Sequence, residues 1–113
     1  MAYESILTAL ADPTRRAIFE DLRRGPLPVQ ALAKGRNVSR PAVSQHLKVL
    51  ELSGLVTAER RGAARYYSVR PKGLAPLRSY LDDMWGDVLQ AFSEEVTRQN
   101  KEARNAATGD KDD

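Results

Sequence analysis

The stretch SRPAVSQHLKVL, at positions 39–50, combines short polar side chains with cationic ones. Hydroxyl, amide and guanidinium groups on one surface suit the edges of DNA bases and the oxygens of phosphates. Glutamine can pair with adenine through two hydrogen bonds, and serine can donate to or accept from several base edges. These residue types therefore favour contact with double-stranded DNA, although each of them alone could be an ordinary solvent-facing residue. The predicted contacts are Ser39, Arg40, Pro41, Ser44, Gln45, His46 and Lys48.

The same stretch has the spacing of an amphipathic helix. At about 100° per residue, Val43, Leu47 and Leu50 fall on one face, which we expect to be buried, and the polar residues fall opposite them. Ser39 is placed to cap the N-terminus of this helix, where unpaired N–H groups favour an anionic partner. His46 lies at the border of the two faces. We expect it to be a half-buried structural residue or a phosphate donor rather than a metal ligand or a base.

The elements before this helix must position it. Asp12 is a good N-cap, Pro13 suits a first helical position, and Gly25 is placed to end that helix. A short helix is predicted over about residues 28–34, followed by the link GRNV at 35–38. Two helices joined by a short link with a glycine are typical of a helix-turn-helix unit.

A second cationic feature follows the helix. Residues 55–60 and 65–70 alternate and are rich in β-branched and aromatic side chains, which predicts a β-hairpin. Its tip carries Arg60, Arg61 and Arg65. A cationic wing of this kind can reach phosphates or the adjacent minor groove. The alternative is that the three arginines only keep an exposed turn soluble.

From Leu74 onward, apolar residues recur at steps of three and four, which predicts a long amphipathic helix to about residue 99. Its stripe is too apolar for an exposed helix on a small monomer, so we expect an isologous homodimer, with an intramolecular core as the alternative. Residues 1–99 would form one domain, and the polar residues 100–113 a disordered tail. The predicted dimer interface comprises Ile6, Leu7, Leu81, Trp85, Val88, Leu89 and Phe92.

Composition limits the function classes. Residues 1–78 carry 14 Lys and Arg against 6 Asp and Glu, and residues 79–113 carry 4 against 9, so the first part suits a polyanion. The chain has no cysteine and a single histidine, which argues against disulfides, thiolate sites and a nucleophile–base pair. We see no export signal and no run of about 20 apolar residues. A cytoplasmic, nucleoid-associated protein without membrane contact is expected.

Three segments of the sequence together resemble the ArsR (SmtB-type) family of bacterial winged helix-turn-helix repressors: LADPTRRAIFEDL, VSRPAVSQHLKVLELSGLV and RRGAARYYSVRPKGLAPL. The resemblance runs from about Leu7 to Phe92. It implies a mainly α fold with a small β-hairpin, in the order of four helices, two strands and a last helix. It also implies a homodimeric transcriptional repressor on a palindromic operator, an inverted repeat in double-stranded DNA. In that family the polar residues of positions 39–48 sit on or beside the DNA-reading helix, and the first and last helices form the dimer.

The chain departs from the family pattern in two places. The family's metal sensors carry cysteines in the helix before the turn, or paired histidine and acidic ligands on the last helix. Here the first place reads PVQALAK, and the last helix has carboxylates without a histidine, which are poor ligands for zinc-type metals. We therefore expect no metal and no cofactor, as in the autorepressor-like members with a Trp at the start of the last helix. The second departure is Arg36, in a turn where relatives often place a large apolar residue.

Several alternatives stay open at this point. An enzyme would need a catalytic cluster that the sequence does not offer. A winged-helix protein-interaction module would bind its partner with little dependence on salt, whereas DNA binding weakens steeply with salt. The related MarR-type regulators are usually longer, with more helix around the motif. The inducer is open as well: a small organic ligand at the dimer interface, a partner protein, or simply the repressor's own abundance.

Overall fold

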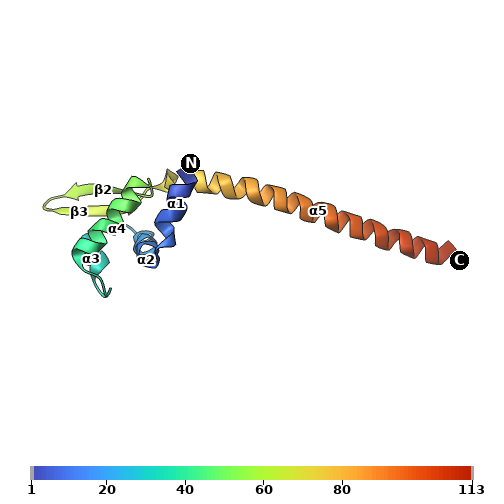
Figure 1. Ribbon diagram of the computed structural model, residues 1–113, viewed down its shortest axis with the longest axis horizontal. Coiled ribbons are helices and arrows are strands. Elements are labelled where there is room, and N and C mark those ends of the chain that lie inside the picture. Colours follow the sequence, from blue (N-terminus) through green and yellow to red (C-terminus); the bar gives the residue numbers. More distant parts are fainter. Residues whose placement is uncertain (1, 113) are drawn as a thin grey trace. The chain divides into compact units, whose positions relative to one another are not determined.

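The computed structural model describes residues 2–112, with side chains to residue 106. Contacts divide the chain into two compact units, which we call the N-terminal unit, Met1–Arg78, and the C-terminal unit, Ser79–Asp113. Figure 1 shows the elements in chain order. They are α1 (Ala2–Ala11), α2 (Pro13–Leu22), β1 (Leu27–Pro28), α3 (Val29–Ala33), α4 (Arg40–Leu52), β2 (Val56–Arg61), β3 (Ala64–Val69), the 3-10 turn η1 (Pro71–Leu74) and α5 (Ala75–Asp112).

The predicted helix starts are confirmed by their capping contacts. The Oδ1 atom of Asp12 accepts a hydrogen bond from the backbone N–H of Arg15 at 2.9 Å, and Pro13 begins α2. The side chain of Ser39 accepts from the backbone N–H of Ala42 at 3.2 Å, so α4 begins where the sequence predicts. Each cap satisfies a backbone donor that the first turn of a helix leaves without an intrahelical partner.

The hairpin is confirmed, but the sheet has a third strand that the sequence did not predict. The strand order is β1-β3-β2, and both pairings are antiparallel. Strand β1 pairs Leu27 with Tyr67 and Pro28 with Tyr66. A strand of only two residues, half of it proline, is too short to show an alternating pattern, and it forms because the edge of β3 offers unpaired backbone groups.

The N-terminal unit is built around one apolar core. Residues from both ends of this unit meet there, and five of them, Ile18, Val43, Leu47, Leu50 and Leu55, are completely buried. Full burial of such a side chain stabilises the fold by about 1.5–3 kcal/mol. The buried face of α4 therefore packs against residues of the same chain. This packing fixes which way the opposite, polar face of α4 points.

The turn after α4 is held by two glycines in close contact. Gly54 has a φ of 77°, a left-handed conformation that costs other residues energy. A Cβ atom at Gly73 would lie 2.2 Å from the carbonyl oxygen of Gly54. The backbone of η1 thus packs directly on the turn between α4 and β2. The hydrogen bond from Arg70 N–H to the carbonyl of Leu55, at 2.9 Å, closes the base of the wing.

In the C-terminal unit, α5 does not end where its apolar stripe ends. The sequence predicts a disordered tail from residue 100, whereas the structure continues the helix through Asp112. Lys, Glu, Arg and Ala, which dominate this stretch, are good helix formers. The guanidinium of Arg98 also lies 2.5 Å from Glu95 and 2.9 Å from Glu102, ion pairs at helical spacing that support the backbone. Within the described residues, no helix is long and apolar enough to cross a membrane.

Candidate nucleic-acid interface

Helix α4 exposes the residues that the sequence predicted to be on its outer face. Its apolar side is fully buried, and the opposite side presents short polar and cationic groups to solvent. The side chain of Ser39 accepts the capping hydrogen bond of α4. At the helix N-terminus, the exposed surface therefore starts with the backbone of Ser39 and with Arg40. The exposed residues are Ser39, Arg40, Pro41, Ser44, Gln45 and Lys48.

His46 is half-buried at the border of the two faces, as its position on the helical wheel predicted. Its Nδ1 atom lies 3.3 Å from Nη1 of Arg15, which belongs to α2. Sequence reasoning missed Arg15, because a contact between residues 31 positions apart leaves no periodic signal. The first arginine of the DPTRR segment is therefore part of the surroundings of the predicted interface.

The carboxylate of Asp12 carries the one clear pKa shift near this site. The backbone N–H of Arg15 holds the pKa of Asp12 below its ordinary value of 3.8, and the positive charge of Arg15 acts in the same direction, while partial desolvation opposes them. Asp12 is therefore a carboxylate that stays ionised at the start of α2 through the physiological pH range.

Arg36 explains how the turn of the helix-turn-helix packs without a large apolar residue. Its Nε donates to the carbonyl of Leu32 at 2.7 Å and its Nη2 to the carbonyl of Ala17 at 3.3 Å. The same nitrogen forms an ion pair with Asp21. With a side chain only 19% exposed, Arg36 caps α3 and ties the turn to α2, so a cation takes the place that apolar packing would fill.

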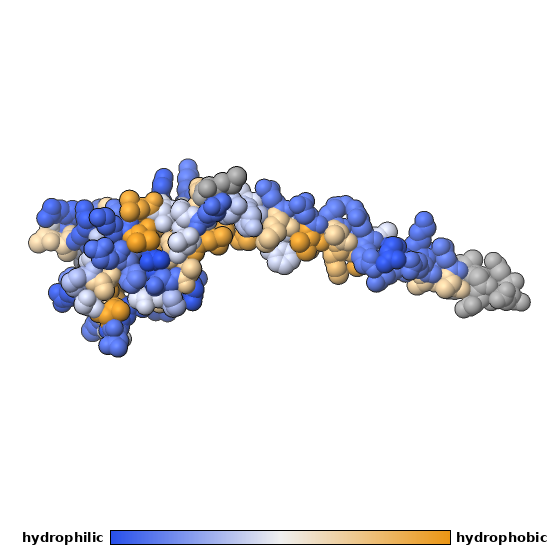
Figure 2. All heavy atoms as spheres, in the orientation of Figure 1, coloured by the Kyte–Doolittle hydropathy of each residue, from blue (hydrophilic) through white to orange (hydrophobic). Residues whose placement is uncertain are grey.

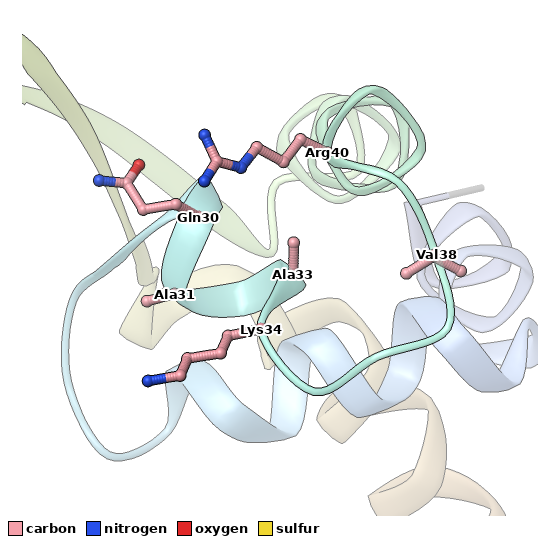
Figure 3. Close-up of a pocket in the computed structure, with 6 residues that line it drawn as sticks. All are labelled: Gln30, Ala31, Ala33, Lys34, Val38 and Arg40. Carbon is pink, nitrogen blue, oxygen red and sulfur yellow. The ribbon is translucent and has the colours of Figure 1, made fainter.

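A pocket opens between α3 and the start of α4, and Figure 3 shows the six residues that line it. The side chain of Arg40 extends from the start of α4 toward Gln30, while Lys34 points away from that pair. Gln30 lies in α3 and Lys34 directly follows that helix as its C-cap residue, and neither was among the predicted contacts. Lys34 adds a positive charge, and Gln30 an amide group, to the surface beside the start of α4.

The wing divides its three arginines between two faces. Arg60 lies directly opposite Arg65 in the β2–β3 register, so these two side chains share one face of the hairpin. Arg61 lies on the other face, with its guanidinium 5.0 Å from the centre of the Tyr66 ring and 3.8 Å from Glu59. Like charges directly opposite each other destabilise a hairpin, and an anion between them removes that cost.

The turn of the wing matches its sequence. Gly62 has a φ of 61° and begins the two-residue loop between Arg61 and Ala64. A positive φ at the first loop position alone is the pattern of a type II′ turn, whose twist matches that of the strands. The wing is consequently a regular hairpin whose tip holds the arginines in a defined register.

The predicted dimer stripe is exposed, with one exception. Trp85 is 54% exposed and Phe92 65%, and Leu7 on α1 is also exposed. Ile6 was predicted to join this stripe, but it is buried in the core of its own chain, where a partner cannot reach its side chain. The large apolar and aromatic residues that α5 exposes are Tyr80, Leu81, Met84, Trp85, Val88, Leu89, Phe92 and Val96. Figure 2 shows apolar surface on the first half of α5 and mainly hydrophilic surface beyond it.

Comparison with known proteins connects this geometry to a family. The family described as "Helix-turn-helix domain" matches residues 10–59. The HTH-type transcriptional regulator Rv2034 of Mycobacterium tuberculosis is 52% identical over 86 residues, which are 76% of this chain and 80% of that protein. The transcriptional repressor SdpR of Bacillus subtilis is 34% identical over 65 residues, 58% of this chain and 72% of that one.

A solved structure agrees with the sequence relatives. The crystal structure of an ArsR family transcriptional regulator matches with a TM-score of 0.71 and 31% identity, covering 76% of this chain and 94% of that one. This neighbour and the two relatives are regulators of transcription rather than enzymes. With its capped α4, its three-stranded wing and these relatives, the chain belongs to the ArsR family of winged helix-turn-helix proteins and is a DNA-binding transcriptional regulator.

Proposed function

We propose that the protein is a homodimeric repressor that reads an inverted-repeat operator through the exposed face of α4. The observation that carries this proposal is the outer face of that helix. Arg40, Ser44, Gln45 and Lys48 are exposed on a helix whose opposite side is completely buried, so their backbone is held rigidly while their side chains stay accessible. A recognition helix in the major groove needs both properties.

We assign different roles to the residues of this surface. Gln45 and Ser44 are the candidates for base edges, and Pro41 for contact with a thymine methyl group. Arg40 and Lys48, together with Lys34 beside the pocket of Figure 3, carry positive charge toward the phosphates, which position the protein without reading sequence. The helix before the turn crosses the DNA backbone in helix-turn-helix proteins; Gln30 lies in that helix here, and Lys34 directly follows it.

The wing supplies a second contact in this proposal. Arg60 and Arg65 share one face and repel each other, so a phosphate between them, or the negative potential of a narrow minor groove, stabilises both. Arg61 is engaged with Tyr66 and Glu59 and contributes less. No ion pair to Arg60 or Arg65 occurs among the residues that the structure describes.

The apolar stripe of α5 supports the proposed dimer. Contiguous exposed apolar residues on one helix face are typical of an interaction surface, and a second copy of the same helix covers it isologously. Leu7 of α1 remains a candidate for the same interface, whereas Ile6 does not. Two recognition helices related by a two-fold axis would enter major grooves about 34 Å apart, which requires an inverted repeat.

The experiment that tests the proposed function is a footprint on the protein's own promoter, followed by fluorescence anisotropy on the protected sequence. We expect a symmetric footprint and an affinity that falls steeply between 50 and 200 mM salt, because bound phosphates release counterions. A single unrepeated half-site would contradict the dimer geometry. Salt-independent binding to a protein, without affinity for DNA, would favour the interaction-module alternative.

Release from DNA is proposed to occur without a metal. The chain has no thiol and a single imidazole, and that imidazole lies in α4. No group of three potential ligands occurs among the described residues. We favour control by the repressor's own abundance, over a small organic ligand or a partner protein. Zinc, cadmium, arsenite and copper, titrated singly into the operator complex, should leave the anisotropy unchanged, and release at one metal per protomer would overturn this part.

A further inference from the structure

We propose that Arg15 is a positioning residue for DNA contact: it holds His46 in the tautomer with its proton on Nε2, and that N–H donates to an operator phosphate. Arg15 itself need not touch DNA. The phosphate contact rests on the proposed function, whereas the tautomer is a property of the free protein. The two parts can therefore be tested separately.

The tautomer follows from the chemistry of the contact. Nη1 of Arg15 lies 3.3 Å from Nδ1 of His46. A guanidinium has only donors and stays charged, so Nδ1 must be the acceptor. A neutral imidazole that accepts on Nδ1 carries its hydrogen on Nε2. In this arrangement the ring has one donor left for a partner outside the N-terminal unit's core.

Arg15 is itself fixed, so it can orient another residue. Its Nε donates to the carbonyl of Ala9 at 2.6 Å, and its Nη2 to the carbonyl of Thr8 at 3.3 Å. These carbonyls belong to the last turn of α1, where they lack intrahelical donors. The guanidinium thus joins the end of α1 to the middle of α4.

The charged groups around the imidazole of His46 have opposite effects on its protonated form. Arg15 repels an imidazolium, and Asp12, whose carboxylate accepts from the backbone N–H of Arg15, attracts one. Protonation of His46 would place a hydrogen on Nδ1 and remove the acceptor that Arg15 uses. The contact with Arg15 therefore exists only with the neutral ring. The neutral ring of His46 therefore donates from a fixed position. A hydrogen bond to a phosphate sets the register of a helix on DNA only if its donor is held in this way.

The tautomer can be read directly, because the chain has one histidine. In the long-range proton–nitrogen NMR spectrum of the full-length 15N-labelled protein, we expect the pattern of the Nε2–H tautomer above about pH 7.5, where imidazoles are neutral. A wild-type ring protonated on Nδ1 would overturn the proposal outright. Arg15→Met, which keeps an apolar stem but no donor, should give a mixture of tautomers, and an unchanged spectrum would also overturn it.

Arg16→Met is the matched control. Arg16 donates to the carbonyl of Leu10 at 3.1 Å, so it also caps the end of α1, but among the described residues the hydrogen bond to His46 comes from Arg15 and not from Arg16. The spectrum of this variant should equal that of the wild type. If Arg15→Met does not fold, Arg15→Lys keeps the charge and a donor and should retain the wild-type tautomer, while a change to the Nδ1–H form in this folded variant would contradict the role of the donor.

Affinity measurements complete the test. His46→Ala should weaken operator binding by about tenfold, the size of one hydrogen bond to a charged group. Arg15→Met should weaken it measurably but by less, because part of its population keeps the competent tautomer, and the double variant should lose little more than His46→Ala alone. Additive losses, or unchanged affinity in Arg15→Met despite an altered tautomer, would overturn the positioning role. Failure of the wild type to bind any duplex would instead overturn the proposed function, and the NMR spectrum would still decide the tautomer.

Discussion

Helices α4 and α5 have the same kind of amphipathic pattern but opposite burial. The apolar side of α4, with Leu47 and Leu50, is completely buried in the N-terminal unit. The apolar side of α5 is exposed, with Leu89 at 57% and Phe92 at 65%. A helical pattern therefore indicates that a face needs cover, and it does not indicate whether the same chain or another one provides it.

The exteriors of the two units differ as well. The N-terminal unit is cationic on its outside, around α4 and the wing, whereas the chain from residue 79 onward carries an excess of acidic residues. Repulsion between phosphates and carboxylates favours DNA contact by the first unit, and the dimer contact proposed above is assigned to the second. The following changes test this division, beginning with the largest expected effect.

Leu47→Ala tests the self-contained core. Because Leu47 is completely buried, the loss of its side chain should lower the free energy of unfolding by about 2–5 kcal/mol. Chemical denaturation followed by circular dichroism measures this. Leu52→Ala on the same helix is the control, since Leu52 is 80% exposed and should change stability by less than about 0.5 kcal/mol.

Trp85→Ala tests whether the face of α5 is covered by a second copy. Large aromatic residues at the centre of an interface contribute about 2 kcal/mol or more to association. We expect the dimer to dissociate at a concentration more than tenfold higher, as measured by sedimentation equilibrium. Leu52→Ala serves here too as an exposed apolar residue outside the stripe. A wild-type protein that is monomeric at micromolar concentration would remove the basis of this prediction.

Gln45→Ala tests base reading by the outer face of α4. The loss of a bidentate contact with adenine should weaken operator binding by about 1–3 kcal/mol and leave binding to random DNA nearly unchanged. Anisotropy titrations on both duplexes give the two values. Gln99→Ala in α5 is the matched control, because the same truncation there lies outside the proposed interface. Equal losses on both duplexes would show that Gln45 contacts the backbone instead.

Arg60→Ala and Arg61→Ala together test the two faces of the wing. Arg60→Ala should weaken binding to all duplexes by about 1 kcal/mol. It should also reduce the slope of log affinity against log salt concentration by about 1. Arg61 should cost less, since its guanidinium is engaged with Tyr66 and Glu59. A larger loss for Arg61 than for Arg60 would reverse the assignment of faces.

Asp12→Asn tests the acid stability of the N-terminal unit, with the smallest expected effect. The pKa of Asp12 is lowered on folding, so its contribution to stability is complete above the ordinary value of 3.8 and is lost as pH falls through the lowered value. Asparagine caps a helix equally well but does not titrate. Below pH 4 the variant should therefore lose less stability with falling pH than the wild type, measured by thermal unfolding.

Local chemistry was sufficient to predict much of this protein from its sequence. Asp12 and Ser39 cap the predicted helices because capping depends on neighbouring residues only. The outer face of α4 and the position of His46 followed from a period of 3.6 residues. The basic hairpin followed from the alternation of residues 55–60 and 65–70.

Other features depended on contacts between distant segments. Strand β1 exists only because β3 lies beside it, and the contact of Arg15 with His46 spans 31 positions. The sequence could not place Ile6, because helical spacing puts Ile6 and Leu7 next to each other and only packing decides which of them enters the core. It predicted one cationic wing, whereas strand register divided Arg60 and Arg65 from Arg61. Periodicity and capping act within a few residues, and tertiary packing alone selects among the faces that they create.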